Sequence, residues 1–168
     1  MNIFKRKIYN KLLEWKNCSN GTRGLLLEGA RRVGKSTIVK EFAENEYRSY
    51  IFIDFDEEGE EIRKIFDAGF RDLDSLFRSL SLYYHTELFP RQSLIVFDEV
   101  QRFPRAHEGR KYLVKDGRYD FIETGSLITL KVLSKGFTNP SEVDYLSRYP
   151  MDFEEFLMAR GDTVSYPR

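Results

Sequence analysis

A glycine-bounded loop near the N-terminus carries the first residues whose types and spacing can do chemistry. Residues 29–36, GARRVGKS, match the pattern G-x-x-x-x-G-K-[ST] at every fixed position. In such a loop the backbone N–H groups surround a phosphate, the lysine reaches the terminal phosphates and the hydroxyl binds Mg²⁺. Lys35 and Ser36 take these two positions, and Thr37 is expected either to meet the α-phosphate or to cap the following helix. The residues predicted to bind the phosphates are Gly29, Ala30, Arg31, Arg32, Val33, Gly34, Lys35, Ser36 and Thr37.

An acidic pair ends an apolar run further along the chain. LIVFDE, residues 94–99, places Asp98 and Glu99 directly after the apolar residues. A strand of this composition would fix Asp98 at its tip, where a carboxylate can hold Mg²⁺ through water. Glu99 could then act as a general base that activates water for attack on a γ-phosphate. Taken alone, the pair would suit a solvent-facing acidic turn, but together with the glycine loop it favours a metal site.

A third polar signature is ETGS, residues 123–126. Thr124 follows the run YDFIE, and its hydroxyl could contact the γ-phosphate or the attacking water. The alternative is a turn stabilised by the hydroxyls of Thr124 and Ser126, and both interpretations stay open. Glu123, one residue earlier, has no role in either interpretation.

The surrounding pattern predicts the elements that must position these residues. Short apolar runs predict buried strands at residues 25–29, 49–55, 93–99 and 119–126. Helical spacing predicts helices at residues 4–17, 35–46, 62–66, 73–88 and 106–116, and another after Pro150 that ends near Gly161. Strands that alternate with helices indicate an α/β fold with a mainly parallel sheet. Ligands of such sheets bind at the carboxyl ends of the strands, which is where all three polar signatures lie.

Composition limits the classes of function. The chain has 168 residues, of which 27 are basic and 27 acidic, so net charge gives no support for nucleic-acid binding. Cys18 is the only cysteine, which excludes an intrachain disulfide and suits a reducing compartment. His85 and His107 are too far apart for a zinc site of the usual spacing, and we expect surface or hydrogen-bonded positions for them. No apolar run approaches the ~20 residues needed to cross a bilayer, so we expect a cytoplasmic protein without a membrane partner.

Four segments together carry a resemblance to a known group of proteins. LLLEGARRVGKST, LIVFDEVQ, YDFIETGSL and YPMDFEEFL resemble the prokaryotic ATPases of the AAA-plus superfamily, in particular a bacterial and archaeal branch whose ATPase core usually precedes a C-terminal domain. The resemblance implies a P-loop NTPase three-layer sandwich, a five-stranded sheet with the P-loop strand central, and ATP and Mg²⁺ as ligands. Residues 1–150 would form the ATPase core with its N-terminal helix, and residues 151–168 the start of a truncated C-terminal region.

The same resemblance implies an arginine that completes the site. ATPases of this superfamily usually receive it from a neighbouring subunit, which suggests a homo-oligomer or another protein partner. Arg148 is the first candidate because it precedes the break at Pro150, and Arg102 and Arg105 come next. Trp15 is expected either to pack the N-terminal helix on the sheet or to lie near the adenine.

Three functions remain open on this basis. The first is ATP hydrolysis coupled to a partner or an appended domain, the second a nucleotide-dependent binding switch with negligible turnover, and the third, least favoured, a small-molecule kinase. A base such as Glu99 favours hydrolysis, because a kinase must exclude water and its acceptor supplies the nucleophile. For the first function the predicted catalytic residues are Lys35, Glu99, Thr124 and Arg148, and the predicted Mg²⁺ ligands are Ser36 and Asp98.

Overall fold

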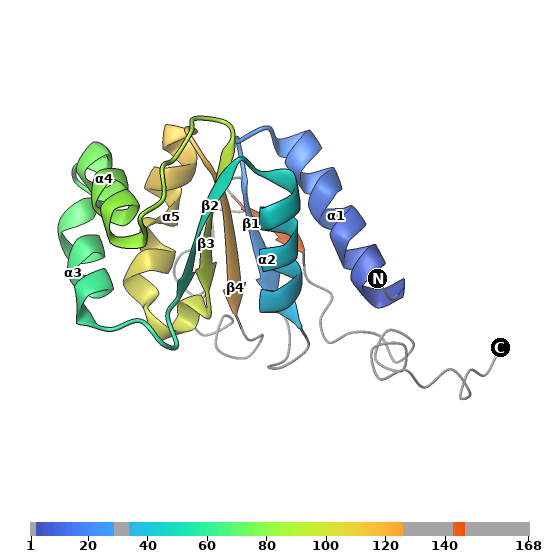
Figure 1. Cartoon of the computed structure of the whole chain (residues 1–168), viewed down its shortest axis with the longest axis horizontal. Coiled ribbons are helices and arrows are strands. Elements are labelled where there is room, and N and C mark those ends of the chain that lie inside the picture. The colour runs from blue at the N-terminus through green and yellow to red at the C-terminus, as the bar shows by residue number, and fades with distance from the viewer. Residues whose placement is uncertain (1–2, 29–33, 126–142, 147–168) are drawn as a thin grey trace.

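The computed structural model describes residues 3–28, 34–125 and 143–146, and its elements alternate between helix and strand (Figure 1). In chain order these are α1 (Ile3–Ser19), β1 (Gly24–Glu28), α2 (Lys35–Glu46), β2 (Ser49–Asp54), α3 (Glu60–Gly69), α4 (Leu73–Tyr84), β3 (Ser93–Asp98), the 3₁₀ turn η1 (Val100–Arg102), α5 (Pro104–Asp116), β4 (Asp120–Gly125) and β5 (Val143–Leu146). None of the helices in these described ranges is long and apolar enough to cross a membrane.

The strands β1 to β4 form an all-parallel sheet, and the short β5 adds to its end parallel to β1. The strand order is β2-β3-β4-β1-β5. The predicted α/β class with a parallel sheet is therefore confirmed. The expectation that the P-loop strand is central is wrong, because β4 inserts between β1 and β3 and leaves only β5 on the other side of β1.

Helices cover both faces of the sheet, so the core has two halves. Figure 1 shows α1 and α2 on one face and α3, α4 and α5 on the other. Because successive side chains of a strand point to opposite faces, Leu25 and Leu27 pack with Phe42 of α2, whereas Leu26 packs in the cluster that contains Phe66 of α3. The continuous apolar runs of the sequence thus reflect strands that are buried on both faces.

The helix predicted at residues 73–88 ends earlier than its apolar pattern suggests. α4 stops at Tyr84, and His85 follows in the left-handed conformation with φ 50°. The His85 N–H donates to the carbonyl of Leu82, which closes the last turn. The prediction failed here because helical apolar spacing continues to Leu88 while the backbone has already turned away.

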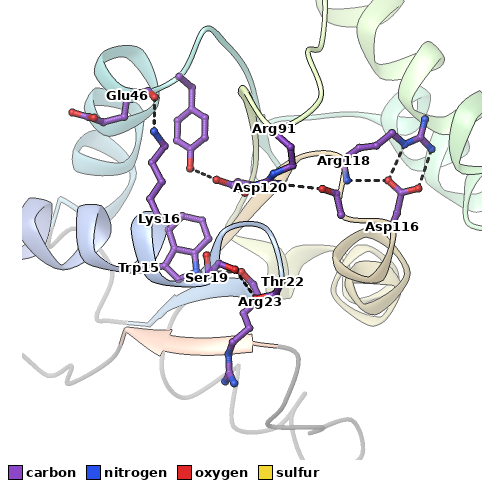
Figure 2. A network of polar contacts seen from close by, with 12 residues as sticks. Trp15, Lys16, Ser19, Thr22, Arg23, Glu46, Arg91, Asp116, Arg118 and Asp120 are labelled. Carbon is purple, nitrogen blue, oxygen red and sulfur yellow. Dashed lines mark hydrogen bonds and ion pairs between the residues drawn. The ribbon is translucent and has the colours of Figure 1, made fainter.

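At the amino end of the sheet, a buried carboxylate links neighbouring parts of the chain. Asp120, the first residue of β4, is 5% exposed. It accepts hydrogen bonds from Tyr47 Oη at 2.6 Å and from Arg91 Nη2 at 2.7 Å (Figure 2). Arg91 also donates to the carbonyl of Gly117 at 3.0 Å. These contacts tie β4 to the chain that precedes β2 and β3.

Trp15 takes the first of its two expected placements. Its side chain is 6% exposed and packs α1 against the sheet in the cluster that includes Leu25 and Leu27. The indole Nε1 donates to the carbonyl of Arg23 at 3.2 Å (Figure 2). Trp15 therefore supports the helix that covers β1.

Candidate functional site

The phosphate loop enters α2 through Gly34. Gly34 is the residue that precedes the helix, and its torsions are φ 82° and ψ 16°, in the left-handed region that glycine adopts without strain. A Cβ at this position would meet no atom within 4 Å, so the backbone torsion and not the available space requires glycine. Residues 29–33 lie outside the described part of the chain.

The first turn of α2 brings a cation and two hydroxyls to the carboxyl end of the sheet. Lys35 is only 5% exposed, although it carries an ammonium group. Ser36 is half-buried and Thr37 is exposed. A helix N-terminus favours negative charge because its first N–H groups and the helix dipole point outward. A buried ammonium at the same place adds to that positive field.

Asp98 lies at the centre of a hydrogen-bonded group that joins three elements. Its carboxylate is at the tip of β3 and the residue is 3% exposed. Ser36 Oγ of α2 donates to Asp98 Oδ1 at 2.7 Å, and Thr124 Oγ1 of β4 donates to the same oxygen at 2.6 Å. Ser36 and Thr124, which are far apart in the sequence, are thus joined through one oxygen of Asp98.

The environment of the Asp98 carboxyl favours the neutral form of this group more than water does. Burial is the largest cause and raises the pKa of the Asp98 carboxyl above its ordinary value. The hydrogen bonds from Thr124 and Ser36 act in the opposite direction, and the nearby charges of Asp54 and Glu99 add to the rise. Asp54 is the Cα partner of Asp98 in the pairing of β2 with β3. A cation placed at this group would offset the cost of keeping Asp98 charged.

Glu99 sits in an unusual backbone conformation beside this group. Its φ is 54° and its ψ 48°, in a region that residues other than glycine rarely adopt and that clusters at functional sites. The Glu99 N–H donates to Thr124 Oγ1 at 3.1 Å. Its carboxylate Oε2 accepts a hydrogen bond from Gln101 Nε2 at 2.5 Å. Both the backbone and the side chain of Glu99 are therefore held by neighbours.

The donor set fits Mg²⁺ bound together with a nucleotide. Mg²⁺ prefers hard oxygen ligands and in phosphate sites takes one or two from the protein and the rest from phosphates and water. Ser36 and Asp98 supply a hydroxyl and a carboxylate oxygen on one side of the group. Within the described ranges no three His, Cys, Asp or Glu side chains gather as a metal site, so a cation held by the protein alone has no support there.

A second polar cluster lies behind Thr124, on the opposite face of β4. Glu123 is 2% exposed, and its Oε1 lies 3.2 Å from His107 Nδ1. Arg110 Nη1 approaches both ring nitrogens of His107, at 3.0 and 2.8 Å, and Arg110 Nε lies 3.7 Å from Glu123 Oε2. His107 and Arg110 belong to α5, so this cluster fixes α5 to the strand that carries Thr124. It gives Glu123, which the sequence left without a role, a set of partners.

The arginines proposed to complete the site are in different situations. Arg102 forms an ion pair with Asp56 at 2.8 Å, and Arg105 forms one with Asp67 at 3.0 Å. Both side chains are about half exposed, at 50% and 53%. Arg148 and Ser126 lie outside the described residues. Gln101 ends the motif LIVFDEVQ, but the residue type and spacing indicated no function for it.

Comparison with known proteins identifies the family of this chain. The sequence model of the AAA_14 family, described as an AAA domain, matches residues 22–157. No curated protein matches the chain. Among solved structures, PCH-2 of C. elegans is similar with a TM-score of 0.44 and 15% identity over 86% of this chain and 42% of that one, so this chain spans less than half the length of PCH-2. Because the family match covers most of its length, the chain belongs to the AAA_14 family of AAA domains, a family of AAA-plus P-loop ATPases.

Proposed function

We propose that this chain binds ATP with Mg²⁺ and hydrolyses the terminal phosphate. One observation carries the proposal: the hydroxyls of Ser36 and Thr124 both donate hydrogen bonds to the same carboxylate oxygen of Asp98, at 2.7 and 2.6 Å. These side chains come from the start of a helix and from the ends of two neighbouring strands. P-loop NTPases place their metal ligands and their γ-phosphate contacts in this way.

Each residue of the site has a proposed role. Lys35 would bind the β- and γ-phosphates, and Gly29–Val33 with Gly34 would surround them with backbone N–H groups. Ser36 and Asp98 would hold Mg²⁺, which neutralises charge on the phosphate oxygens when it is bound. Thr124 would contact the γ-phosphate or the attacking water. Membership of a family that typically consists of ATPases supports these roles.

Hydrolysis is favoured over transfer to another acceptor because of Glu99. A carboxylate that directly follows the metal ligand can take the proton of a water molecule as that water attacks the γ-phosphorus. The hydrogen bonds of Glu99 to Thr124 and Gln101 hold it next to Asp98. A kinase would instead need the acceptor to supply the nucleophile. The arginines late in the given sequence, Arg148, Arg160 and Arg168, are scattered and do not cluster as in an arginine-rich lid.

A binding switch with negligible turnover is the second candidate. The contacts of Thr124 support this alternative. Its hydroxyl bonds both Asp98 and the Glu99 N–H, so Thr124 is placed to respond to the nucleotide. A phosphate that engaged Thr124 would compete with the bond to Asp98. In this alternative the change at Thr124 would order a surface for a partner without completing hydrolysis.

We propose that the nucleotide cycle changes the state of a partner. We infer that the nucleotide state is passed to an appended domain, to another copy of the chain or to a different protein, with Arg148 as the first candidate for the completing arginine. Net charge gives no support for nucleic acid as that partner.

The proposal is tested by Mg²⁺-dependent phosphate release from ATP, with nucleotide binding recorded on the same samples. Lys35→Ala should lose ATP binding, and Glu99→Gln should keep binding and lose turnover by roughly 10²-fold or more. Lys115→Ala and Glu108→Gln, both on the exposed side of α5, are the matched controls and should behave like the unsubstituted chain.

The three functions give different results in this assay. Turnover without an acceptor supports hydrolysis, and tight binding without turnover at any protein concentration supports the switch. Phosphorylated product in a mixture of metabolites, with little free phosphate, would support the kinase. Loss of neither binding nor turnover in Lys35→Ala would overturn the assignment of the phosphate site itself.

A further inference from the structure

The Gln101 side chain makes a contact with the candidate base that the roles above do not use. Its Nε2 donates a hydrogen bond to Glu99 Oε2 at 2.5 Å. A carboxylate only accepts hydrogen bonds, so the amide must present its NH₂ group and not its oxygen. This chemistry fixes the orientation of the Gln101 amide.

The turn that carries Gln101 is firmly anchored. Gln101 is the middle residue of η1, which is closed by the Arg102 N–H donating to the Glu99 carbonyl at 3.0 Å. Val100, before it, is fully buried, and Phe103, after it, is 8% exposed. Both side chains belong to the apolar cluster beneath α5. The turn therefore cannot move without disturbing the core.

Gln101 keeps this position although its own oxygen is left unsatisfied. Gln101 Oε1 is buried and has no hydrogen-bond partner in the part of the chain that is described. A buried amide oxygen without a partner is unfavourable, and an apolar side chain of the same size would avoid that cost. The bond to Glu99 is the contact that an apolar side chain could not replace.

We propose that Gln101 is the positioning residue of Glu99 and orients its carboxylate for attack of water on ATP. This inference rests on the proposed hydrolysis. Gln101 binds Oε2, and in this proposal the other oxygen, Oε1, takes the proton from water. If Gln101 held and released Glu99 as a switch, it would have to lie on an element that moves separately from Glu99. Gln101 lies two residues away in the same anchored turn, so it moves with Glu99 and suits a fixed orientation.

The contact itself is tested without turnover. The chain has two glutamines and six asparagines, so a ¹H–¹⁵N spectrum holds eight side-chain NH₂ groups, and substitution of Gln101 assigns its own signal among them. The Gln101 NH₂ signal should be shifted downfield and exchange slowly with water, and Glu99→Ala should abolish both effects. A Gln101 signal that Glu99→Ala leaves unchanged would overturn the proposal.

The role in turnover is tested on Gln101→Ala and Gln101→Glu, with Gln92→Ala as the control because Gln92 is exposed. Both variants at 101 should lower kcat about 10-fold or more, as the loss of a partner that orients an active-site ligand commonly does, with the KM for ATP and the ATP affinity little changed. In the Glu99→Gln background, Gln101→Ala should change the residual rate by less than about two-fold.

Other results separate this inference from the proposed function. Unchanged or increased kcat in Gln101→Ala, with turnover intact in the unsubstituted chain, would overturn the role of Gln101 alone. A parallel loss of ATP affinity and kcat would mark Gln101 as merely structural and also overturn it. Absence of turnover in the unsubstituted chain would overturn the hydrolysis proposal and this role with it, while Lys35→Ala would still test nucleotide binding.

Discussion

Thr124 and Asp98 are joined by a buried hydrogen bond of 2.6 Å, in which a hydroxyl at the end of β4 donates to a carboxylate at the tip of β3. The same hydroxyl accepts the Glu99 N–H at 3.1 Å, so its donor and one acceptor position are both used inside the protein. Strand ends that are adjacent in the sheet are thereby connected through one side chain.

Thr124→Val tests this connection, because valine has nearly the same shape and no hydroxyl. Asp98 loses one of its two hydroxyl donors while it remains 3% exposed, and its pKa should rise further. We expect the free energy of unfolding to fall by about 1–3 kcal/mol. Urea denaturation without nucleotide measures the change, and Thr124→Ser, which keeps the hydroxyl, should recover most of it. A valine variant as stable as the unsubstituted chain would contradict the finding.

Much of this site follows from the sequence, and the reason is the geometry of parallel sheets. The glycine loop, Asp98 and Thr124 were each predicted at the carboxyl end of a strand, and such ends share one edge of the sheet. That rule places residues at an edge but does not order the strands. The central place of β4 could not be read from the sequence, because the lengths of the connections allow several orders.

The cluster of Glu123, His107 and Arg110 behind Thr124 was not predicted. The apolar pattern of a buried strand does not indicate which of its charged residues have buried partners. Glu123 is one charged residue in a buried strand, and its partners His107 and Arg110 lie three residues apart on α5. Such spacing puts both on one face of the helix. A charged residue inside an apolar strand, opposite polar residues on the buried face of a helix, was the available signal. His107 is thus one of the hydrogen-bonded histidines that the sequence allowed.

Glu123→Ala should be strongly destabilising. It leaves the Arg110 guanidinium, in a residue 6% exposed, without its carboxylate, and such losses cost about 3–5 kcal/mol. The double variant Glu123→Leu with Arg110→Met removes both charges and should lose less than the single variant. Chemical denaturation of the two proteins decides the matter. If the double variant is the less stable one, packing rather than charge pairing holds the cluster.

Gly34→Ala should destabilise the protein through the backbone alone. At φ 82° an alanine costs about 1–2 kcal/mol, although its Cβ would meet no atom within 4 Å. Gly59→Ala is the matched control, because Gly59 also has open space around it but a φ of −92°. The control should be neutral or slightly stabilising. Equal melting temperatures for the two variants would argue against the left-handed conformation of Gly34.

Tyr47→Phe should reduce the sensitivity of the protein to alkaline pH. Burial, followed by the Asp120 charge and hydrogen bond, raises the pKa of Tyr47 far above its ordinary value of 10.0. The unfolded chain releases this proton at a lower pH than the folded chain does. The stabilising contribution is therefore complete below pH 10.0 and is lost as the pH rises above that value.

The slope of stability against pH gives the test for Tyr47. One tyrosine that stays protonated in the folded state contributes up to about 1.4 kcal/mol per pH unit above its ordinary pKa. Tyr47→Phe should be less stable at neutral pH, because Asp120 loses a donor, and its free energy of unfolding should fall less steeply above pH 10. Parallel curves for the two proteins would contradict this assignment.

The strand order has a consequence for how the nucleotide site comes into being during synthesis. β1, which leads into the phosphate loop, pairs with β4 and β5, and both follow it in the chain by about a hundred residues. While the chain emerges from the ribosome, β2 and β3 can pair with each other, but β1 has no strand beside it until residues 120–125 have emerged. The loop is thus made well before the strand that would support it when it holds a phosphate.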